Sequence, residues 1–234
     1  ESLKIFHKLN IQNIKIPSGE VTNLNLIKKI SKTKMNIFLS TGMSSTKEIE
    51  SALNILNNNK VCLMQCTSLY PCDIKKSGVH LLDIFKKYTN NLGFSDHTLT
   101  PTAAICSVQY GAKYIEKHIT FSNHMYGSDA PFAMEPNEFS NYVKLIKESK
   151  VIFKNIHKSK DDLLPDVKKM KKIFEKSIVV KKNLKKGIII KSTDLAFKKP
   201  GTGIKPKNIN FFVGKKLIKD INKDQLLLYK HIKI

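Results

Sequence analysis

The sequence has no arginine, few cysteines and glycines, and no long apolar run. All 41 basic residues among the 234 are lysines. The counts of 4 cysteines and 10 glycines exclude a disulfide-framework peptide and a collagen, and 41% hydrophobic residues exclude a wholly disordered chain. No stretch approaches the roughly 18 consecutive apolar residues of a membrane span, and no charged-then-apolar leader opens the chain. We therefore expect a cytoplasmic protein with no membrane segment.

The net charge of +22 would suit a nucleic-acid partner, because clustered cations displace counterions from phosphate. The missing arginines argue against such a partner, since the planar guanidinium is the usual reader of guanine edges and of bidentate phosphates. Lysine, asparagine and isoleucine are all abundant, which is typical of a coding bias spread over the surface. We expect a solvated lysine coat with weak attraction for anions and no specific nucleic-acid partner. A lysine-rich nucleic-acid binder is the less favoured hypothesis.

The cysteines form no CxxC pair, so the sequence contains neither a zinc knuckle nor a redox motif. They are Cys62, Cys66, Cys72 and Cys106. In a cytoplasm they are expected to stay reduced. Cys62 and Cys66 share one face of a predicted strand, where buried small hydrophobic side chains are the favoured interpretation.

Short apolar runs alternate with helical patterns over the first two thirds of the chain. The predicted strands are residues 11–16, 36–40, 61–66, 92–95 and 113–118. The predicted helices between them are residues 23–31, 46–57, 79–88 and 101–110. This alternation predicts an α/β protein with a parallel sheet.

Polar residues gather directly after each predicted strand. In a (β/α)8 TIM barrel, the active site is built from the carboxyl ends of all the strands, whereas an open parallel sheet binds its ligand at a single point where the strand order reverses. Polar residues after every predicted strand therefore favour the barrel. An eight-unit barrel takes about 250 residues, so we expect about five of the eight units here, with three absent from the front.

The pattern of the chain changes after residue 156. Residues 1–156 are predicted to form the barrel part, and residues 157–176 a charged, helix-containing linker interrupted by Pro165. Residues 177–234 are predicted to form a small β-rich domain. Its expected β-like runs are residues 178–180, 187–190 and 194–197.

Two histidines follow neighbouring predicted strands. Glu116 and His118 are two residues apart and face the same side, and His97 comes directly after the preceding strand. Two imidazoles that converge there leave most positions of a divalent metal open for water and substrate, as in catalytic sites. Hydrogen-bonded core histidines are an equally favoured interpretation. Asp96 and Glu116 are candidates for orienting the imidazoles.

Other polar side chains lie at the same predicted rim. Lys15, Ser18 and Glu20 come where a strand becomes a loop, and a lysine there can hold a phosphate or carboxylate as a point charge. Tyr70 and Asp129 lie on loops, where a hydroxyl and a carboxylate can hydrogen-bond a polyhydroxy ligand. Taken alone, each of these patterns is also common on a solvated surface.

Six strings occur in one order along the chain: KIPSGE at 15–20, LSTGM at 39–43, QCTSLYP at 65–71, FSDHT at 94–98, EKHIT at 116–120 and KPGTGI at 199–204. Together they resemble the sialic acid synthase family, whose members make N-acetylneuraminate, legionaminate, pseudaminate and related nonulosonates. The resemblance covers residues 11–234. Residues 177–234 resemble the family's antifreeze-like (SAF) domain, which has a β-clip-like fold.

The resemblance implies a condensation of phosphoenolpyruvate with an N-acetylated sugar, such as N-acetylmannosamine, that releases phosphate. It implies that His97 and His118 bind a divalent ion, Mn²⁺ or Mg²⁺. It also implies a domain-swapped homodimer. The residues that it assigns to phosphoenolpyruvate are Lys15, Ser18, Ser40 and Ser95, and those that it assigns to the sugar are Glu20, Tyr70, Asp129 and Lys199. It places Ser68 in contact with substrate without saying which of the two.

Three departures from the family pattern limit what the resemblance implies. Ser68 stands where some members have asparagine, and Lys199 stands where arginine is usual. At position 199 a lysine ammonium therefore replaces a planar guanidinium with five hydrogen-bond donors. The family's first strands supply a catalytic glutamate and a further lysine, and no counterpart precedes residue 11. We therefore expect these residues alone to be inactive. The alternative hypothesis is a catalytically inactive remnant or sugar-binding module, and the sugar is left open.

Overall fold

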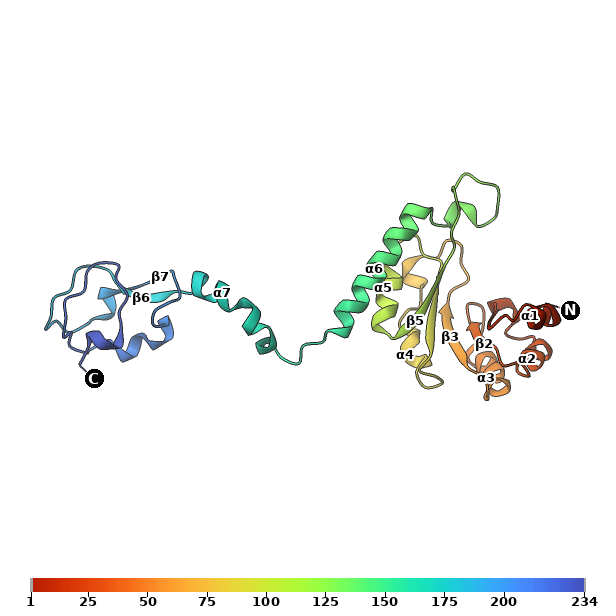
Figure 1. Cartoon of the computed structure of the whole chain (residues 1–234), viewed down its shortest axis with the longest axis horizontal. Coiled ribbons are helices and arrows are strands. Elements are labelled where there is room, and N and C mark those ends of the chain that lie inside the picture. The colour runs from red at the N-terminus through yellow and green to blue at the C-terminus, as the bar shows by residue number, and fades with distance from the viewer. Residues whose placement is uncertain (1, 234) are drawn as a thin grey trace. The chain divides into compact units, whose positions relative to one another are not determined.

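The computed structural model describes residues 2–233, which divide into two compact units on either side of the bond between Ile156 and His157. In the first unit, strands alternate with helices along the chain (Figure 1). Among the described residues, every helix is too short or too polar to cross a bilayer.

The first unit is built on one parallel sheet. Its strands pair in chain order, each with the next, and the register places Lys15 opposite Phe38 and Ser95 opposite Glu116. This confirms the predicted fold class, consecutive strand–helix units of a (β/α)8 barrel. Each strand lies within two residues of its predicted bounds: β1 (Asn13–Ile16), β2 (Asn36–Ser40), β3 (Val61–Cys66), β4 (Leu92–Asp96) and β5 (Ala112–Lys117).

Helices α2 and α3 begin at side-chain caps, Asn23 and Ser45, and α5 begins directly after Pro101. The backbone amide of Ser45 donates to Glu48 Oε2 at 2.7 Å at the start of α3. The long helix α6 has no counterpart among the predicted helices, although Pro136 at its first position is a common start signal. The bounds are α1 (Ser2–Lys8), α2 (Leu24–Ile30), α3 (Thr46–Ile55), α4 (Leu81–Phe85), α5 (Thr102–Gln109) and α6 (Pro136–Lys154).

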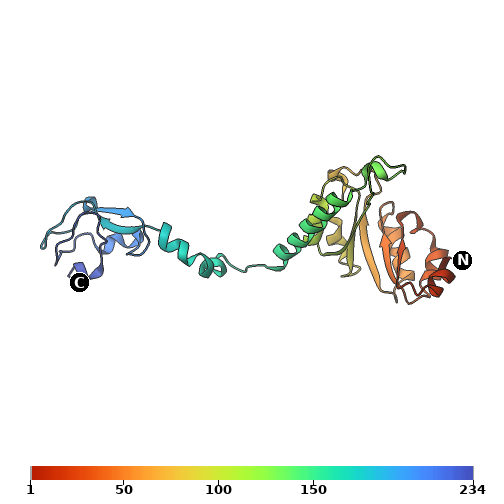
Figure 2. The same ribbon diagram turned by 45° about the horizontal axis from the view of Figure 1, so that its top comes forward.

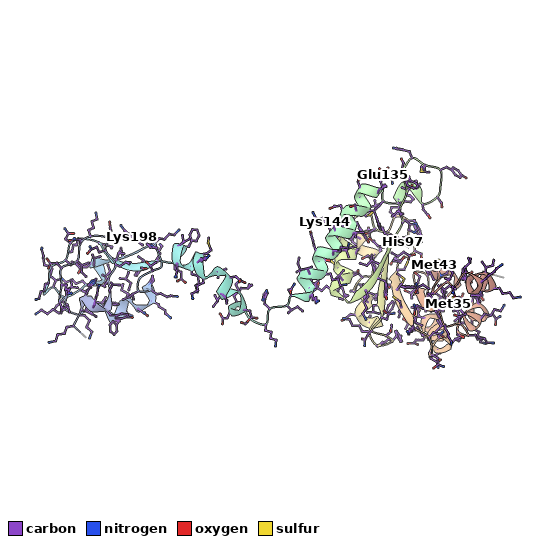
Figure 3. All side chains as sticks on the ribbon, in the orientation of Figure 1. Met35, Met43, His97, Glu135, Lys144 and Lys198 are labelled. Atoms are coloured by element: carbon purple, nitrogen blue, oxygen red, sulfur yellow. The ribbon has the colours of Figure 1, made fainter. Side chains whose placement is uncertain are left out.

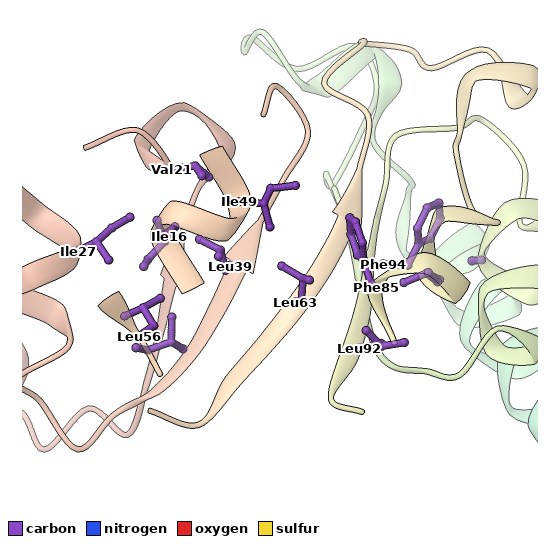
Figure 4. Close-up of a cluster of buried hydrophobic side chains, with 14 of the residues drawn as sticks. Ile16, Val21, Ile27, Leu39, Ile49, Leu56, Leu63, Phe85, Leu92 and Phe94 are labelled. Carbon is purple, nitrogen blue, oxygen red and sulfur yellow. The ribbon is translucent and has the colours of Figure 1, made fainter. Parts of the chain in front are cut away.

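One face of the sheet packs against the helices and forms the core of this unit (Figure 4). Its strand residues include Ile16, Leu39, Leu63 and Phe94, each at most 1% exposed. Successive strand residues point to opposite faces, so the residues between them point away from the helices.

The opposite face is concave (Figure 2). The rings of Phe38 on β2 and Tyr114 on β5 lie 5.0 Å apart, although β3 and β4 separate these strands in the sheet. Contact across two intervening strands requires the sheet to curl, as in a barrel.

The second unit begins with helix α7 (Leu164–Phe174). Strands β6 (Ser177–Val180) and β7 (Leu195–Lys198) pair antiparallel, with Val179 opposite Ala196. The predicted run 187–190 forms only an isolated bridge, Ile189 with Lys216, because short turns interrupt its pairing. The unit has its own core, which includes Ile178, Val180, Leu184, Phe212 and Leu227.

Candidate functional site

Three aromatic rings meet where β3, β4 and β5 end. The centroids of His97 and His118 lie 5.3 Å apart, and Tyr70 lies 4.2 Å from His97 and 5.8 Å from His118. His97 follows β4 and His118 follows β5, so both are placed by the backbone of the sheet. His97 lies toward the upper end of the sheet in Figure 3.

The His97 ring is held in one orientation. Its Nδ1 lies 2.9 Å from the carbonyl oxygen of Thr67, and the amide of Cys72 donates to the carbonyl of His97 at 2.8 Å. A carbonyl only accepts hydrogen bonds, so Nδ1 carries the proton and Nε2 keeps its lone pair. The imidazole therefore presents a free nitrogen.

His118 is held by a carboxylate and by the segment before α6. Its Nδ1 lies 3.3 Å from Asp129 Oδ2, and its carbonyl accepts from the amide of Met134 at 3.0 Å. Both His118 and Asp129 are partly exposed. Tyr70, Phe132 and both histidines line a small cavity here.

The donor set fits a divalent cation held by imidazole. One ring nitrogen of each histidine is engaged by an oxygen that fixes the ring, which is the usual arrangement around metal-binding histidines. Within residues 2–233, no cluster of three or more histidine, cysteine, aspartate or glutamate side chains has metal-binding geometry.

A cation and an anion meet on the concave face next to the histidines. Lys15 of β1 donates a hydrogen bond to Glu116 of β5. Burial by itself would raise the pKa of Glu116, but Lys15, Ser95 and His118 outweigh it, and the pKa lies below its ordinary value. Glu116 is thus an anion at neutral pH, and it contacts Lys15 rather than fixing an imidazole by a hydrogen bond.

Several serine hydroxyls lie close together near the histidines and the Lys15–Glu116 pair. Ser18 Oγ and Ser68 Oγ are 3.3 Å apart. A Cβ on Gly42 would lie 2.3 Å from Ser68 Oγ and 2.8 Å from Cys66 Sγ, so the hydroxyls converge here only because this position has no side chain. The hydroxyl of Ser40 is buried and, within the described chain, has no hydrogen-bond partner. It also helps to lower the pKa of the Cys66 thiol.

Cys66 lies beside His97, with Sγ 3.8 Å from Nδ1. Burial by itself would raise the pKa of the Cys66 thiol, but hydrogen bonds from His97 and Ser95 outweigh it, and the pKa lies below its ordinary value. Burial likewise lowers the pKa of His97, but Cys66 and the Thr67 carbonyl outweigh it, and the pKa lies above its ordinary value. Cys66 is buried, as predicted, but it is also a polar neighbour of the site.

Asp96 points away from the imidazoles, toward the helices. Its Oδ2 lies 3.4 Å from Lys117 Nζ and accepts from the Tyr142 hydroxyl at 2.9 Å. Its Oδ1 accepts from the amide and the hydroxyl of Thr98, both at 2.8 Å. The expectation that Asp96 orients an imidazole directly is wrong, because adjacent strand residues face opposite sides. Lys117 and Tyr142 were not predicted from the sequence, although Lys117 precedes His118 in the EKHIT string.

Two residues assigned by the resemblance lie outside these clusters. Glu20 accepts a hydrogen bond from Asn23 Nδ2 at 2.7 Å, within its own turn. Lys199 lies in the second unit, where its Nζ is 4.7 Å from the ring centroid of Phe174. The structure thus brings together His97, His118, Tyr70 and Asp129, and beside them Lys15, Ser18, Ser40, Ser68 and Ser95.

Comparison with known proteins shows a family for each part of the chain. The NeuB family model matches residues 1–158, and the SAF domain model matches residues 175–233. The chain is 34% identical to the N,N'-diacetyllegionaminic acid synthase of Campylobacter jejuni, over 97% of this chain and 69% of that protein. It is 27% identical to the pseudaminic acid synthase of Helicobacter pylori, over 94% of this chain and 65% of that protein.

The fold has a counterpart among solved structures. The N-acetylneuraminic acid synthetase of Leptospira borgpetersenii, solved in complex with citrate, superimposes with a TM-score of 0.65 at 23% identity, over 71% of this chain and 60% of that one. The chain spans about two thirds of the length of these relatives. With matches to both domain models and an identity of 34% to a named synthase, the chain belongs to the NeuB family and carries a SAF domain in its second unit.

Proposed function

We propose that this chain carries part of the active site of a nonulosonic acid synthase, which condenses phosphoenolpyruvate with an N-acetylated sugar and releases phosphate. Its relatives are named as synthases of diacetyllegionaminic and pseudaminic acids. The observation that carries the proposal is the pair of imidazoles 5.3 Å apart, with His97 presenting a free Nε2 beside a lysine and several hydroxyls.

His97 and His118 would hold a divalent ion, Mn²⁺ or Mg²⁺. When bound, such an ion supplies charge that orients and polarises a carbonyl oxygen. Tyr70 and Asp129 stand beside the imidazoles and would orient the hydroxyl and acetamido groups of the sugar. Two other residues proposed to contact the sugar, Glu20 and Lys199, would have to reach it from another turn and from the second unit.

Phosphoenolpyruvate would bind on the side of Lys15. The ammonium group of Lys15 supplies a positive charge on the concave face, and Glu116 holds that group in place. The unpartnered hydroxyl of Ser40 and the hydroxyls of Ser18 and Ser95 would donate to phosphate or carboxylate oxygens. Holding both reactants in adjacent positions would supply a large part of the rate enhancement.

The proposal is tested at two levels. The 234-residue chain is titrated with Mn²⁺, with a His97→Ala/His118→Ala variant as control. The longest natural product that contains this chain is incubated with phosphoenolpyruvate, Mn²⁺ and either N-acetylmannosamine or a bacillosamine-derived aldose, and released phosphate is measured. We expect Mn²⁺ binding that the double variant loses, and phosphate release with at least one sugar. Absence of release with every acetamido sugar would refute the proposal and favour an inactive, sugar-binding remnant.

We also propose a homodimer in which the SAF domain of one subunit supplies Lys199 to the site of the other. The SAF domain, residues 175–233, lies in the second compact unit, His157–Ile234. Mixing Lys199→Ala and His97→Ala variants of the longest natural product that contains this chain tests this arrangement, because exchanged subunits would restore one intact site per dimer. Activity of the mixture no higher than the sum of the two separate proteins would contradict it.

A further inference from the structure

A buried ion pair lies directly behind the two imidazoles, on the helix-facing side of the sheet. Asp96 and Lys117 are the last residues of β4 and β5, and they face each other in the register of these strands. Their side chains are 0% and 2% exposed. His97 and His118 are the next residues along the chain. The ion pair therefore joins the two strands immediately before the imidazoles.

A third element is tied to the same carboxylate. Tyr142 of α6 is 2% exposed, and its hydroxyl donates to Asp96 Oδ2 at 2.9 Å. Burial, reinforced by the charge of Asp96, raises the pKa of Tyr142, so the phenol stays neutral and keeps its proton for this hydrogen bond. The carboxylate thus links α6, β4 and β5 at one point.

The same groups fix the backbone on both sides of His97. The amide and the hydroxyl of Thr98 donate to Asp96 Oδ1, and Lys117 Nζ donates to the carbonyl of Thr98. An aspartate that accepts from the amide two residues ahead closes a tight turn. Here, the residue enclosed by that turn is His97. Its main chain has little freedom to move relative to β5.

The buried network of Asp96, Lys117, Tyr142 and Thr98 is not explained by folding stability alone. Removing two charges from water carries a desolvation penalty, and well-packed apolar residues of similar size often stabilise a protein as well or better. Buried polar networks that are fully satisfied do, however, select one arrangement of the elements that they connect. Such selection matters most where two ligands on different strands must meet.

We propose that Asp96, Lys117 and Tyr142 are positioning residues, which hold β4 and β5 at the separation that lets His97 and His118 share one divalent ion. The proposal rests on the metal-binding role proposed above for the two histidines. None of the three residues touches the ion or a substrate. They act through the backbone of the residues that do.

The test removes one hydrogen bond of the network. In the full chain, Tyr142→Phe deletes the hydroxyl that α6 contributes and keeps the packing of the ring. The control is Tyr88→Phe, which also deletes a tyrosine hydroxyl that donates to a carboxylate, here the partly buried pair with Glu50. Mn²⁺ affinity is measured from the electron paramagnetic resonance signal of the free ion, and folding is checked by thermal unfolding.

We expect the Kd for Mn²⁺ to rise by up to about tenfold in Tyr142→Phe, the lower end of the effect of losing a direct hydrogen-bond partner of a metal-binding histidine, because Tyr142 acts one step further from the imidazole. Tyr88→Phe should leave this Kd unchanged. The ring ¹⁵N resonances of His97 and His118, recorded without metal, should shift in Tyr142→Phe only. These resonances report on the imidazoles even if unfolding temperatures fall equally in both variants.

Equal Mn²⁺ affinities in the two variants would overturn the positioning role. The unmodified chain could bind Mn²⁺ while the longer natural product releases no phosphate. That result would overturn only the proposed condensation reaction, because the positioning role is judged from Mn²⁺ binding. No Mn²⁺ binding by the unmodified chain would overturn the positioning role and the proposed metal site together.

Discussion

Lys15 and Glu116 form an ion pair that joins the first and last strands of the sheet. These strands lie at opposite edges, with three strands between them. Their side chains meet only because the sheet curls, so the pair spans the concave face of the half-barrel. It also holds a lysine ammonium within the group of residues that we propose for phosphoenolpyruvate.

The first prediction concerns the pH dependence of this pair. The pKa of Glu116 in the folded protein lies below its ordinary value of 4.5. A lowered folded pKa means that the stabilising effect is present above the unfolded pKa and is lost as the pH falls through the folded pKa. Glu116→Gln should therefore unfold about 1–3 °C below the unmodified chain at pH 7, since the pair is partly exposed. The difference should shrink as the pH falls below 4.5 and through the lower pKa of Glu116 in the folded protein.

Thermal unfolding of the first unit, followed at several pH values, measures this difference. Glu148→Gln is the matched control, because Glu148 lies 4.0 Å from Lys144 in an exposed pair on α6. That control should change the unfolding temperature by less than Glu116→Gln at pH 7. A difference for Glu116→Gln that persists undiminished to pH 3 would contradict the assigned role of the pair.

The arrangement of the barrel part was predictable because each strand and helix carries its own periodic signal. The strand pattern identified β1 to β5, and the curled parallel sheet follows from that order. Helix α6 was not predicted, because lysines and glutamates interrupt its apolar face and Tyr142 and Ser149 are its only buried residues. In the second unit, β6 and β7 lie within one residue of the predicted runs 178–180 and 194–197, whereas the predicted run 187–190 forms only an isolated bridge.

The candidate site was predictable only where a residue type itself indicates chemistry. His97 and His118 stand out because imidazoles after adjacent strands are uncommon. Lys117 and Tyr142 do not stand out, because lysine is abundant here and a buried lysine cannot be told from an exposed one without its partner. Gly42 gives no chemical signal at all, since its role is to leave room for three side chains.

The second prediction concerns thiol reactivity. Burial raises the pKa of Cys62 to about 12, and its side chain is almost fully enclosed. Cys106 is partly exposed. Iodoacetamide at pH 8 should therefore label Cys106 first and Cys62 last, because only an accessible thiolate reacts. Cys66 should react faster than Cys62, since its pKa is lowered.

Mass spectrometry of peptides from a time course of alkylation gives the order directly. Labelling in urea is the control, because all four thiols should then react at similar rates. Labelling of Cys62 as fast as that of Cys106 in the folded protein would contradict the burial of β3. Addition of Mn²⁺ and phosphoenolpyruvate should slow the labelling of Cys66 alone, if the ligands bind where we propose.

The third prediction concerns the missing side chain at Gly42. A Cβ there would come within 2.3 Å of Ser68 Oγ and 3.0 Å of Ser18 Oγ. Serine hydroxyls can rotate away, so we expect Gly42→Ala to fold but to misplace both donors. Each hydrogen bond to a charged ligand contributes about 1.5–3 kcal/mol, so the Kd for phosphoenolpyruvate should rise by roughly tenfold or more.

Isothermal titration calorimetry with Mn²⁺ present measures this Kd. The matched control is Gly19→Ala, whose Cβ would meet only the end of Met43 at an ordinary contact distance of 3.6 Å. We expect that variant to bind normally. Equal affinities for the two variants would show that the hydroxyls near Gly42 do not contact the ligand.

The fourth prediction separates the charge of the buried pair from its geometry. Asp96→Asn leaves Lys117 buried without a counter-charge, and breaking a buried pair in this way typically costs about 3–5 kcal/mol of unfolding free energy. Asp96→Asn/Lys117→Gln removes both charges and should recover most of that loss, because no uncompensated charge is left. Urea unfolding of the first unit measures both values. A double variant as unstable as Asp96→Asn would show that the loss comes from the hydrogen bonds of Asp96 to Thr98 and Tyr142 rather than from the unpaired lysine.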